Sequence, residues 1–264
     1  SAQKEAEYII VYPQIIPLQK LGLPTHSPLA SLPAPHPLFE DTSRVIGVSP
    51  YQAGDSPRHI HWTASAHNRA LLVKRYRPAI ARETMICLDL DLEDYAFTRL
   101  YAASELAIVT AASIANHIAV RESLPVGLAT QAIDPLQDAA RTMQLPPRQE
   151  RNHLMGILEI LARAQTYRRE QESRLNDLIP MPFPQFLRDV AMRLTWGTTL
   201  VIITGRETAA LIDVVAYLKQ QGLSIALVLV MPDAPSETVK DQSAMLSLPI
   251  YHVWQEQELE VTWL

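Results

Sequence analysis

The sequence has 264 residues, of which 48% are hydrophobic and 19% charged, so it can form an α/β domain with a buried core and an appended segment. A net charge of −5 gives no electrostatic reason to expect a nucleic-acid partner, because phosphate binding requires clustered Lys and Arg. The single cysteine, Cys87, excludes an intrachain disulfide and a tetrahedral cysteine metal site.

The first 80 residues are predicted to form a β-rich extension. Residues 8–12 are β-branched and aromatic, and Pro13 follows them, so they predict a strand. Residues 22–37 are rich in proline and predict an irregular arm. A second apolar run, at 71–76, predicts another strand. We therefore divide the chain into an extension over 1–80 and an α/β domain over 81–264.

From residue 83 onward, the pattern alternates between strands and helices. Two further edge strands are expected near the end of the chain, at 250–254 and 259–263. A strand–helix–strand unit connects parallel strands, so the pattern predicts an open, mainly parallel sheet with helices on both faces. Short apolar runs predict buried strands at 85–90, 126–132, 199–203 and 224–230. Helical spacing of apolar residues predicts helices at 99–121, 149–165, 184–193 and 208–221, the last ended by Gly222. The mixed-charge run at 167–174 predicts an exposed, solvated face.

A polar and aromatic stretch precedes the α/β domain. Gly54 and Asp55 supply turn chemistry, because Gly tolerates a positive φ and Asp bonds to nearby amides. In one interpretation, Asp55 pairs with Arg58 to brace the turn while Trp62 fills a gap beside the core. In the other, Arg58 and His61 form a recognition surface for an acidic or phosphorylated partner.

This stretch resembles the signature of the domain-of-unknown-function 58 family, approximately Tyr-x-x-Gly-Asp-x-x-Arg-x-Ile-x-Trp-x-x-Ser-Ala. The strands and helices over 85–230 also follow the usual order of that family. The resemblance implies a von Willebrand factor A-like domain, in a protein with two membrane helices upstream that is encoded beside a MoxR-type AAA+ ATPase. The matching positions are Tyr51, Gly54, Asp55, Arg58, Ile60, Trp62, Ser65 and Ala66.

The resemblance also locates a metal site to be tested. Metal-binding domains of this type hold Mg²⁺ or Mn²⁺ with Asp-x-Ser-x-Ser after the first core strand and an Asp after a later strand, among other oxygen ligands. Here Asp89 matches the leading Asp, but Asp91 and Glu93 replace both serines, and Gly205 stands where the later Asp would be. We expect a degenerate site without a cofactor, in which Arg206 neutralises the carboxylates. Weak Mg²⁺ or Ca²⁺ binding by the three carboxylates is the alternative.

No catalytic motif stands out in the sequence. Cys87 lies inside an apolar strand and is predicted to be an inert core thiol. The sequence contains no Gly-x-Ser-x-Gly elbow, His-Glu-x-x-His helix, Walker loop or Gly-x-Gly-x-x-Gly turn. We therefore expect a partner-binding protein and not an enzyme.

The function we expect is that of a non-catalytic protein-interaction module on the cytoplasmic face of a bacterial membrane, working with a MoxR-type ATPase. No stretch reaches the roughly 18 consecutive apolar residues of a membrane helix, so the anchor is expected upstream of Ser1. One alternative is a divalent-metal-dependent hydrolase that uses Asp89, Asp91 and Glu93. The other is a structural subunit of an envelope assembly.

Overall fold

The computed structural model shows a chain with two compact units. One comprises Pro28–Ala81, and the other comprises Ser1–Ser27 together with Arg82–Leu264. The following account covers the residues that the structure describes, and each unit is treated by itself. These residues are 10–18, 40–51, 60–68, 70–78, 83–136, 139–169, 180–233, 246 and 248–260.

The smaller unit contains an antiparallel strand pair and a short helix. Strand β1 (Glu40–Pro50) pairs with β2 (Leu72–Pro78), which confirms the strand predicted at 71–76. Helix α1 (Trp62–Asn68) precedes β2 in the chain. Ser65 connects the two, because its Oγ accepts from the Leu72 amide at 2.9 Å and donates to the Leu72 carbonyl at 3.3 Å. The buried Ser65 hydroxyl thus ties α1 to the first residue of β2.

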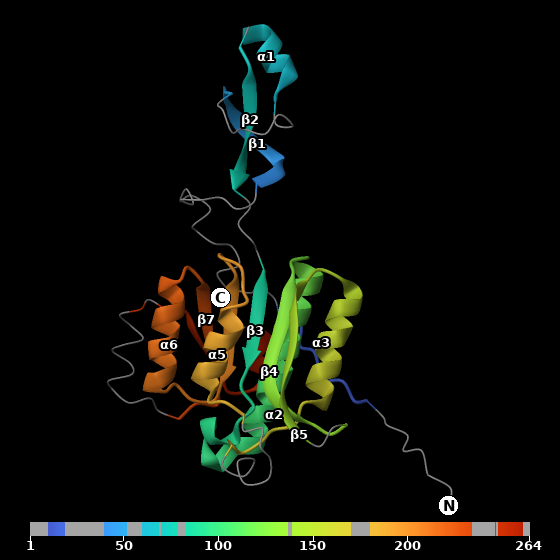
Figure 1. Ribbon diagram of the computed structural model, residues 1–264. Coiled ribbons are helices and arrows are strands. Elements are labelled where there is room, and N and C mark those ends of the chain that lie inside the picture. The colour runs from blue at the N-terminus through green and yellow to red at the C-terminus, as the bar shows by residue number, and fades with distance from the viewer. Residues whose placement is uncertain are drawn as a thin grey trace, which may run out of the picture. The chain divides into compact units, whose positions relative to one another are not determined.

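The larger unit is built on a six-stranded sheet with the strand order β5-β4-β3-β6-β7-β8. Strands β4, β3, β6, β7 and β8 run parallel, and β5 is an antiparallel edge strand. The expected open, mainly parallel α/β sheet is therefore confirmed (Figure 1). The strands are β3 (Thr84–Leu88), β4 (Val126–Asp134), β5 (Ala139–Arg148), β6 (Thr199–Thr204), β7 (Ser224–Val230) and β8 (Ile250–Val253).

Helices cover both faces of this sheet, as expected (Figure 1). Alternate residues of β3 pack into the two cores on opposite faces of the sheet. Ile86 and Leu88 pack into the core beneath α2 and α3, whereas Met85 and Cys87 pack into the core beneath α5 and α6. Successive side chains of a strand point to opposite faces, so a continuous apolar run is required here. The helices are α2 (Leu100–Asn116), α3 (Arg151–Arg163), α5 (Phe183–Ala191) and α6 (Ala209–Gln220).

Helix α2 is the main core helix. Together with its flanking turns it forms a stretch, Phe97–Arg121, that by length and composition could cross a membrane, but 78% of its most apolar window is buried inside the fold. Its buried hydroxyls are satisfied within the helix, since Thr110 Oγ1 donates to the Leu106 carbonyl and Ser113 Oγ to the Val109 carbonyl, both at 2.7 Å. This pairing lets polar residues lie in an apolar core without a penalty for unmade hydrogen bonds.

The strand predicted at 8–12 is wrong for its described part. Residues 10–12 lie outside any strand and are exposed, with Val11 75% exposed. The segment is held further along, where Ile16 and Leu18 are buried in the α2 core and the Ile16 amide donates to Ser113 Oγ at 3.0 Å. Its backbone therefore bonds to a helix side chain and not to a sheet. The arm predicted at 22–37 lies outside the described residues.

Two sheet edges also differ from expectation. No strand is predicted over 139–148, because Pro146 and Pro147 mark a loop, yet β5 includes both prolines. An edge strand tolerates proline, since one row of its amides has no partner in the sheet. At the other edge, the strand expected at 259–263 is wrong for its described part, because Glu256–Glu260 is a 3-10 helix that places only Leu259 in the core.

Gly222 ends α6 as predicted, with φ +87, and an added Cβ would lie 2.3 Å from Trp196 Nε1. We predict that Gly222→Ala lowers the unfolding free energy by about 2 kcal/mol, from the left-handed backbone and the displaced indole. Urea denaturation followed by circular dichroism measures this. The control is Gly156→Ala in α3, whose Cβ would meet only the end of the Leu145 side chain, at 3.3 Å. Equal losses in the two variants would contradict the account.

Candidate functional site

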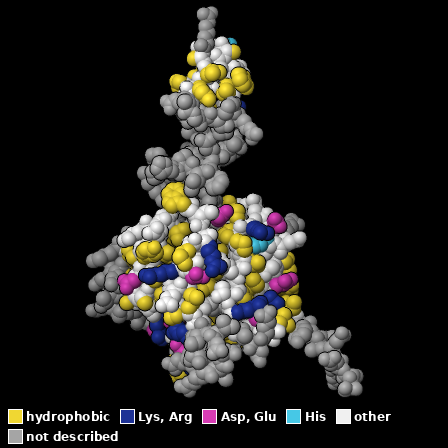
Figure 2. Space-filling view, in the orientation of Figure 1, with side chains coloured by type: hydrophobic (Ala, Val, Ile, Leu, Met, Phe, Trp, Pro, Cys, Tyr) yellow, Lys and Arg dark blue, Asp and Glu magenta, His cyan; other side chains and the backbone are white. Residues whose placement is uncertain are grey.

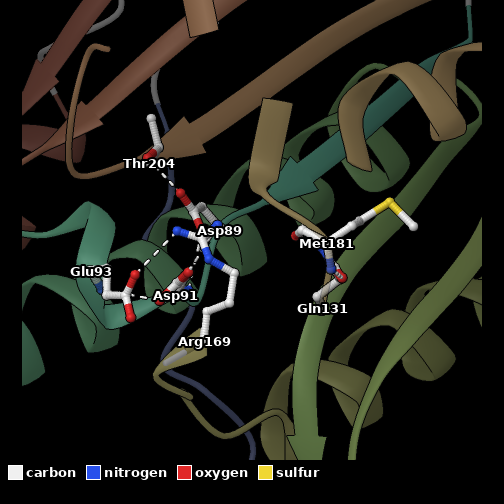
Figure 3. A network of polar contacts seen from close by, with 7 residues as sticks. All are labelled: Asp89, Asp91, Glu93, Gln131, Arg169, Met181 and Thr204. Atoms are coloured by element: carbon white, nitrogen blue, oxygen red, sulfur yellow. Dashed lines mark hydrogen bonds and ion pairs between the residues drawn. The ribbon is translucent and has the colours of Figure 1, made fainter. Parts of the chain in front are cut away.

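The predicted carboxylates lie where two neighbouring parallel strands end. Asp89 directly follows β3, and Thr204 is the last residue of β6. The Asp89 amide donates to the Ile203 carbonyl at 2.9 Å, and Thr204 Oγ1 donates to Asp89 Oδ2 at 2.8 Å (Figure 3). Asp89 and Thr204 are each 1% exposed. The pairing of β3 with β6 thus fixes this carboxylate at the carboxyl-end edge of the sheet.

The alternating acidic residues form consecutive turns. Asp89 Oδ1 accepts from the Asp91 amide at 3.1 Å, and Asp91 Oδ1 accepts from the Glu93 amide at 3.1 Å. Each Asp therefore caps an amide two residues ahead, which is the local bond that Asp makes in turns. These bonds lead the chain into the short 3-10 helix Leu92–Asp94. The spacing that suggests metal ligands is explained by backbone capping.

Arg169 brings a positive charge to Asp91 and Glu93. Its Nη2 lies 3.1 Å from Glu93 Oε2, and its Nη1 lies 3.6 Å from Asp91 Oδ2 (Figure 3). Two backbone bonds bring it there, because the Tyr167 amide donates to the Leu90 carbonyl at 3.2 Å and the Tyr167 carbonyl accepts from the Leu92 amide at 2.9 Å.

The neutralising role expected of Arg206 is therefore wrong for Asp91 and Glu93. Arg206 Nη2 lies 3.8 Å from Asp233 Oδ2, and in this loop its charge acts on Asp94, where it partly offsets the rise in that pKa caused by burial. Arg169 could not be found from the sequence, because it is 76 residues from Glu93 and lies in a run that predicts a solvated face. Only the backbone contact of Tyr167 with the 89–93 loop reveals the pair.

Tyr95 and Gly205 occupy the place of the missing metal ligand. The Tyr95 hydroxyl donates to the Asp89 carbonyl at 2.6 Å, and the side chain is 1% exposed. A Cβ at Gly205 would lie 2.4 Å from Tyr95 Cδ1 and 2.8 Å from the Asp94 carbonyl oxygen. The arrangement therefore has no room for the Asp that a metal-binding relative carries there. The residues present do not fit the metal centre that the resemblance locates.

The signature residues lie in the smaller unit. The Tyr51 amide donates to the Leu71 carbonyl at 2.9 Å, and His61 Nδ1 accepts from the Ala64 amide at 3.2 Å. The side chain of Trp62 is 69% exposed. Ser65 makes the bonds to Leu72 described above. Gly54, Asp55 and Arg58 lie outside the described residues, so neither interpretation of that turn is tested.

Comparison with known families identifies the chain. The model of the family described as "Protein of unknown function DUF58" matches residues 47–179, half of the sequence. This chain belongs to the DUF58 family. The match includes the signature stretch, the 89–95 loop and Arg169. No curated protein matches the chain.

Several solved structures resemble this DUF58 chain distantly. One is the conserved hypothetical protein BatB from Bacteroides thetaiotaomicron, with 12% identity over 65% of this chain and 88% of that one, at a TM-score of 0.39. A second is an aerotolerance-related membrane protein from Bacteroides fragilis, with 14% identity, 68% and 96% coverage and a TM-score of 0.43. A third is a von Willebrand factor type A structure from Catenulispora acidiphila, with 9% identity, 72% and 42% coverage and a TM-score of 0.45.

Burial dominates the electrostatics of the site. Burial raises the pKa of Asp89 well above its usual range, and the charge of Asp94 adds to the effect. Burial raises the pKa of Asp91 to about 6, although Arg169 opposes the rise. The pKa of Asp94 is raised for the same first reason. The loop therefore retains protons at a pH where exposed carboxyls are ionised.

A second polar contact anchors the segment before α5. The side-chain amide of Gln131, on β4, donates from Nε2 to the Met181 carbonyl at 2.9 Å and accepts at Oε1 from the Met181 amide at 3.0 Å (Figure 3). The Gln131 side chain thus bonds both backbone polar groups of Met181, as a neighbouring strand would do. Nothing in the sequence pattern singles out Gln131, which is 5% exposed. Its role is to hold residues 180–182 against the sheet.

The raised pKa of Asp91 predicts a pH dependence of stability. A carboxyl whose pKa rises on folding stabilises the fold below its unfolded pKa, near 4, and loses that contribution as the pH rises through about 6. We predict that Asp91→Asn removes roughly 2 kcal/mol of the fall in unfolding free energy between pH 4 and 7. Urea titrations at several pH values test this, with Asp213→Asn on the exposed face of α6 as the control. A variant as pH-dependent as the wild type would refute the assignment.

Proposed function

We propose that this chain is a non-catalytic protein-interaction module of a membrane-anchored bacterial protein. The observation that carries the proposal is the internal neutralisation of the 89–95 loop. Thr204 and a backbone amide satisfy Asp89, while Arg169 pairs with Asp91 and Glu93. These contacts come from the chain itself and leave Asp91 Oδ2 as the loop oxygen that is buried without a hydrogen-bond partner in the described residues. They hold the half-buried Glu93 and Asp94 in a fixed arrangement.

The burial of the titratable groups argues against catalysis by them. A general acid or base must come within hydrogen-bond reach of its substrate. Asp89 and Asp91 are each 1% exposed, and both already accept hydrogen bonds from the chain. Cys87 is fully buried in β3, and burial raises the pKa of its thiol, which keeps the nucleophilic thiolate from forming.

The partner we propose is a MoxR-type AAA+ ATPase on the cytoplasmic side of the membrane. Membership of the DUF58 family supports this partner, because the family is the basis of the expected association. Open parallel sheets bind ligands beyond the carboxyl ends of their strands. We therefore assign the contact to that edge, around Asp89–Asp94 and Thr204–Glu207. The membrane anchor is part of the same proposal.

Capture from native membranes tests this function. We predict that the immobilised chain retains an AAA+ ATPase, identified by mass spectrometry. Arg206→Glu, at the carboxyl-end edge, should retain at least about fivefold less, because it reverses a half-exposed charge there. The matched control is Arg193→Glu, just after α5 at the opposite end of the strands, which should retain as much as the wild type. Failure to recover any AAA+ ATPase would count against the function.

The alternative function is a metal-dependent hydrolase that uses the carboxylates of Asp89, Asp91 and Glu93. We predict no saturable binding of Mg²⁺, Mn²⁺ or Ca²⁺ at millimolar concentration by calorimetry, and no shift in melting temperature. The reason is that the Arg169 guanidinium already pairs with Asp91 and Glu93. In the described residues, no three His, Cys, Asp or Glu side chains are grouped to hold a metal. Saturable binding that Asp89→Asn abolishes would favour the hydrolase. Self-association without ATPase capture would favour a structural subunit.

A further inference from the structure

Helices α5 and α6 carry large apolar side chains on their outer side as well as on their inner side. Their inner residues are buried together in the core on one face of the sheet, among them Phe186, Val190 and Leu218. Met192, the C-cap of α5, is nevertheless 79% exposed, and Tyr217 on α6 is 47% exposed. Single exposed apolar residues are common on proteins, whereas a group of them marks a contact surface. The meaning of these two side chains therefore depends on whether they lie together.

Arg188 joins the two exposed side chains. Its Cζ lies 5.4 Å from the centroid of the Tyr217 ring, so the guanidinium of α5 covers the ring of α6. Met192 is four residues after Arg188, and its amide donates to the Arg188 carbonyl at 3.1 Å. Residues four apart in a helix lie on the same side, one turn from each other. We call Arg188, Met192 and Tyr217 the α5–α6 surface. Figure 2 shows hydrophobic and basic side chains at the surface over these helices.

The Arg188 guanidinium has no acidic partner among the described residues. Its neighbour Asp189 pairs with Arg193, at 3.1 Å between Oδ2 and Nη2. Asp213 is exposed one helical turn before Tyr217, yet it makes no ion pair with Arg188 in the described structure. The aromatic ring therefore positions the guanidinium and leaves its N–H groups available to an incoming acceptor.

The α5–α6 surface lies away from the 89–95 loop. After α5 the chain turns into the start of β6, and after α6 it turns into the start of β7. Met192 and Tyr217 are thus near the amino ends of these parallel strands, whereas the loop follows the carboxyl end of β3. The composition also suits protein binding, because Tyr and Arg are enriched among residues that dominate interfaces and Met adapts its shape to a partner.

We propose that the α5–α6 surface binds a segment of a partner protein that carries an Asp or Glu beside an apolar side chain. The carboxylate accepts hydrogen bonds from the Arg188 guanidinium, whose planar donors match two carboxylate oxygens. The apolar side chain covers Met192 and the Tyr217 ring, which removes their exposed area from water. This inference goes beyond the proposed function, because it gives the chain a second partner at a different place.

Charge favours this occupant over two others. A two-fold contact between copies of the chain through this surface would bring Arg188 against Arg188, and like charges at an interface repel. An anionic membrane binds clusters of Lys and Arg, whereas Asp189 and Asp213 lie on the same helices as this single unpaired arginine. One carboxylate with an apolar neighbour complements the surface better than either.

Peptide binding tests this surface on the full 264-residue chain. The probe is a fluorescein-labelled helical peptide of Ala, Leu and Glu, measured by fluorescence anisotropy beside a peptide with Lys in place of every Glu. We predict that the wild type binds the Glu peptide, and more weakly as salt is raised. Arg188→Glu should weaken this binding at least about tenfold and should strengthen binding of the Lys peptide. Met192→Ser with Tyr217→Ser should also weaken binding of the Glu peptide at least about tenfold, although Arg188 is kept.

The matched controls lie with α2, which covers the opposite face of the sheet. Arg121 is exposed at the end of the π-helix that follows α2, so Arg121→Glu changes the net charge as Arg188→Glu does. Phe97 is 81% exposed, so Phe97→Ser removes an exposed ring elsewhere. Both controls should bind the Glu peptide within about twofold of the wild type. The inference is overturned if the wild type does not bind this peptide, if Arg188→Glu binds it equally, or if Arg121→Glu loses as much.

Two further measurements test the other occupants. We predict that the wild type neither sediments with vesicles containing phosphatidylserine nor self-associates in analytical ultracentrifugation in a way that Arg188→Glu changes. A change in either would overturn the choice of an acidic protein segment. Circular dichroism of each variant checks that the fold is intact, as expected for exposed positions.

The same variants separate this inference from the proposed function. Arg188→Glu should capture as much AAA+ ATPase as the wild type, because the surface lies away from the carboxyl-end edge. A loss of ATPase in this variant would overturn the claim of a second partner. If the wild type captures no ATPase but binds the Glu peptide through Arg188, the proposed function fails and the α5–α6 surface stands.

Discussion

The pairing of β3 with β4 and β6 is the constraint on which the rest of the larger unit depends. β3 is buried on both faces and bonded on both edges, which favours apolar residues, and after Thr84 at its start it contains no polar side chain until it ends. Asp89 directly follows β3: its amide donates to the Ile203 carbonyl of β6, and its carboxylate accepts from the Thr204 hydroxyl. From Asp89 the backbone leaves the sheet through two successive capped turns, at the amides of Asp91 and Glu93.

The loop solves an electrostatic problem with groups from its own chain. Several carboxyls close together would repel one another, and burial would make each charge more costly. Two amides, the Thr204 hydroxyl and the Arg169 guanidinium offset part of this cost. The rest appears as a raised pKa of Asp91, whose Oδ2 is buried without a hydrogen-bond partner in the described residues. Tyr95 fills the space beside Gly205. The shape of the loop is thus set by contacts within the chain.

Acidic groups have two roles at this edge. The buried carboxyls of Asp89 and Asp91 accept hydrogen bonds that shape the 89–95 loop, whereas Glu105 and Glu256 are exposed. The distinction arises from the layers of the fold. Asp89 follows the central strand and turns into the protein, while Glu105 lies on the outer side of α2 and Glu256 follows edge strand β8. Position relative to the sheet thus decides which of these carboxylates are exposed.

The periodicity of the sequence by itself determined the parallel sheet, the helices on both of its faces and the end of α6 at Gly222, because burial on one or both sides leaves a pattern in neighbouring residues. The sequence pattern did not predict edge strand β5, because an edge strand tolerates the prolines that usually mark a loop. Sequence spacing also located Asp89, Asp91 and Glu93 together. Only the tertiary structure decided that Arg169 pairs with them, that Tyr95 excludes an Asp at 205, and that Arg99 lies over the ring of Trp254. Those contacts join residues far apart in the chain, and such proximity leaves no local pattern.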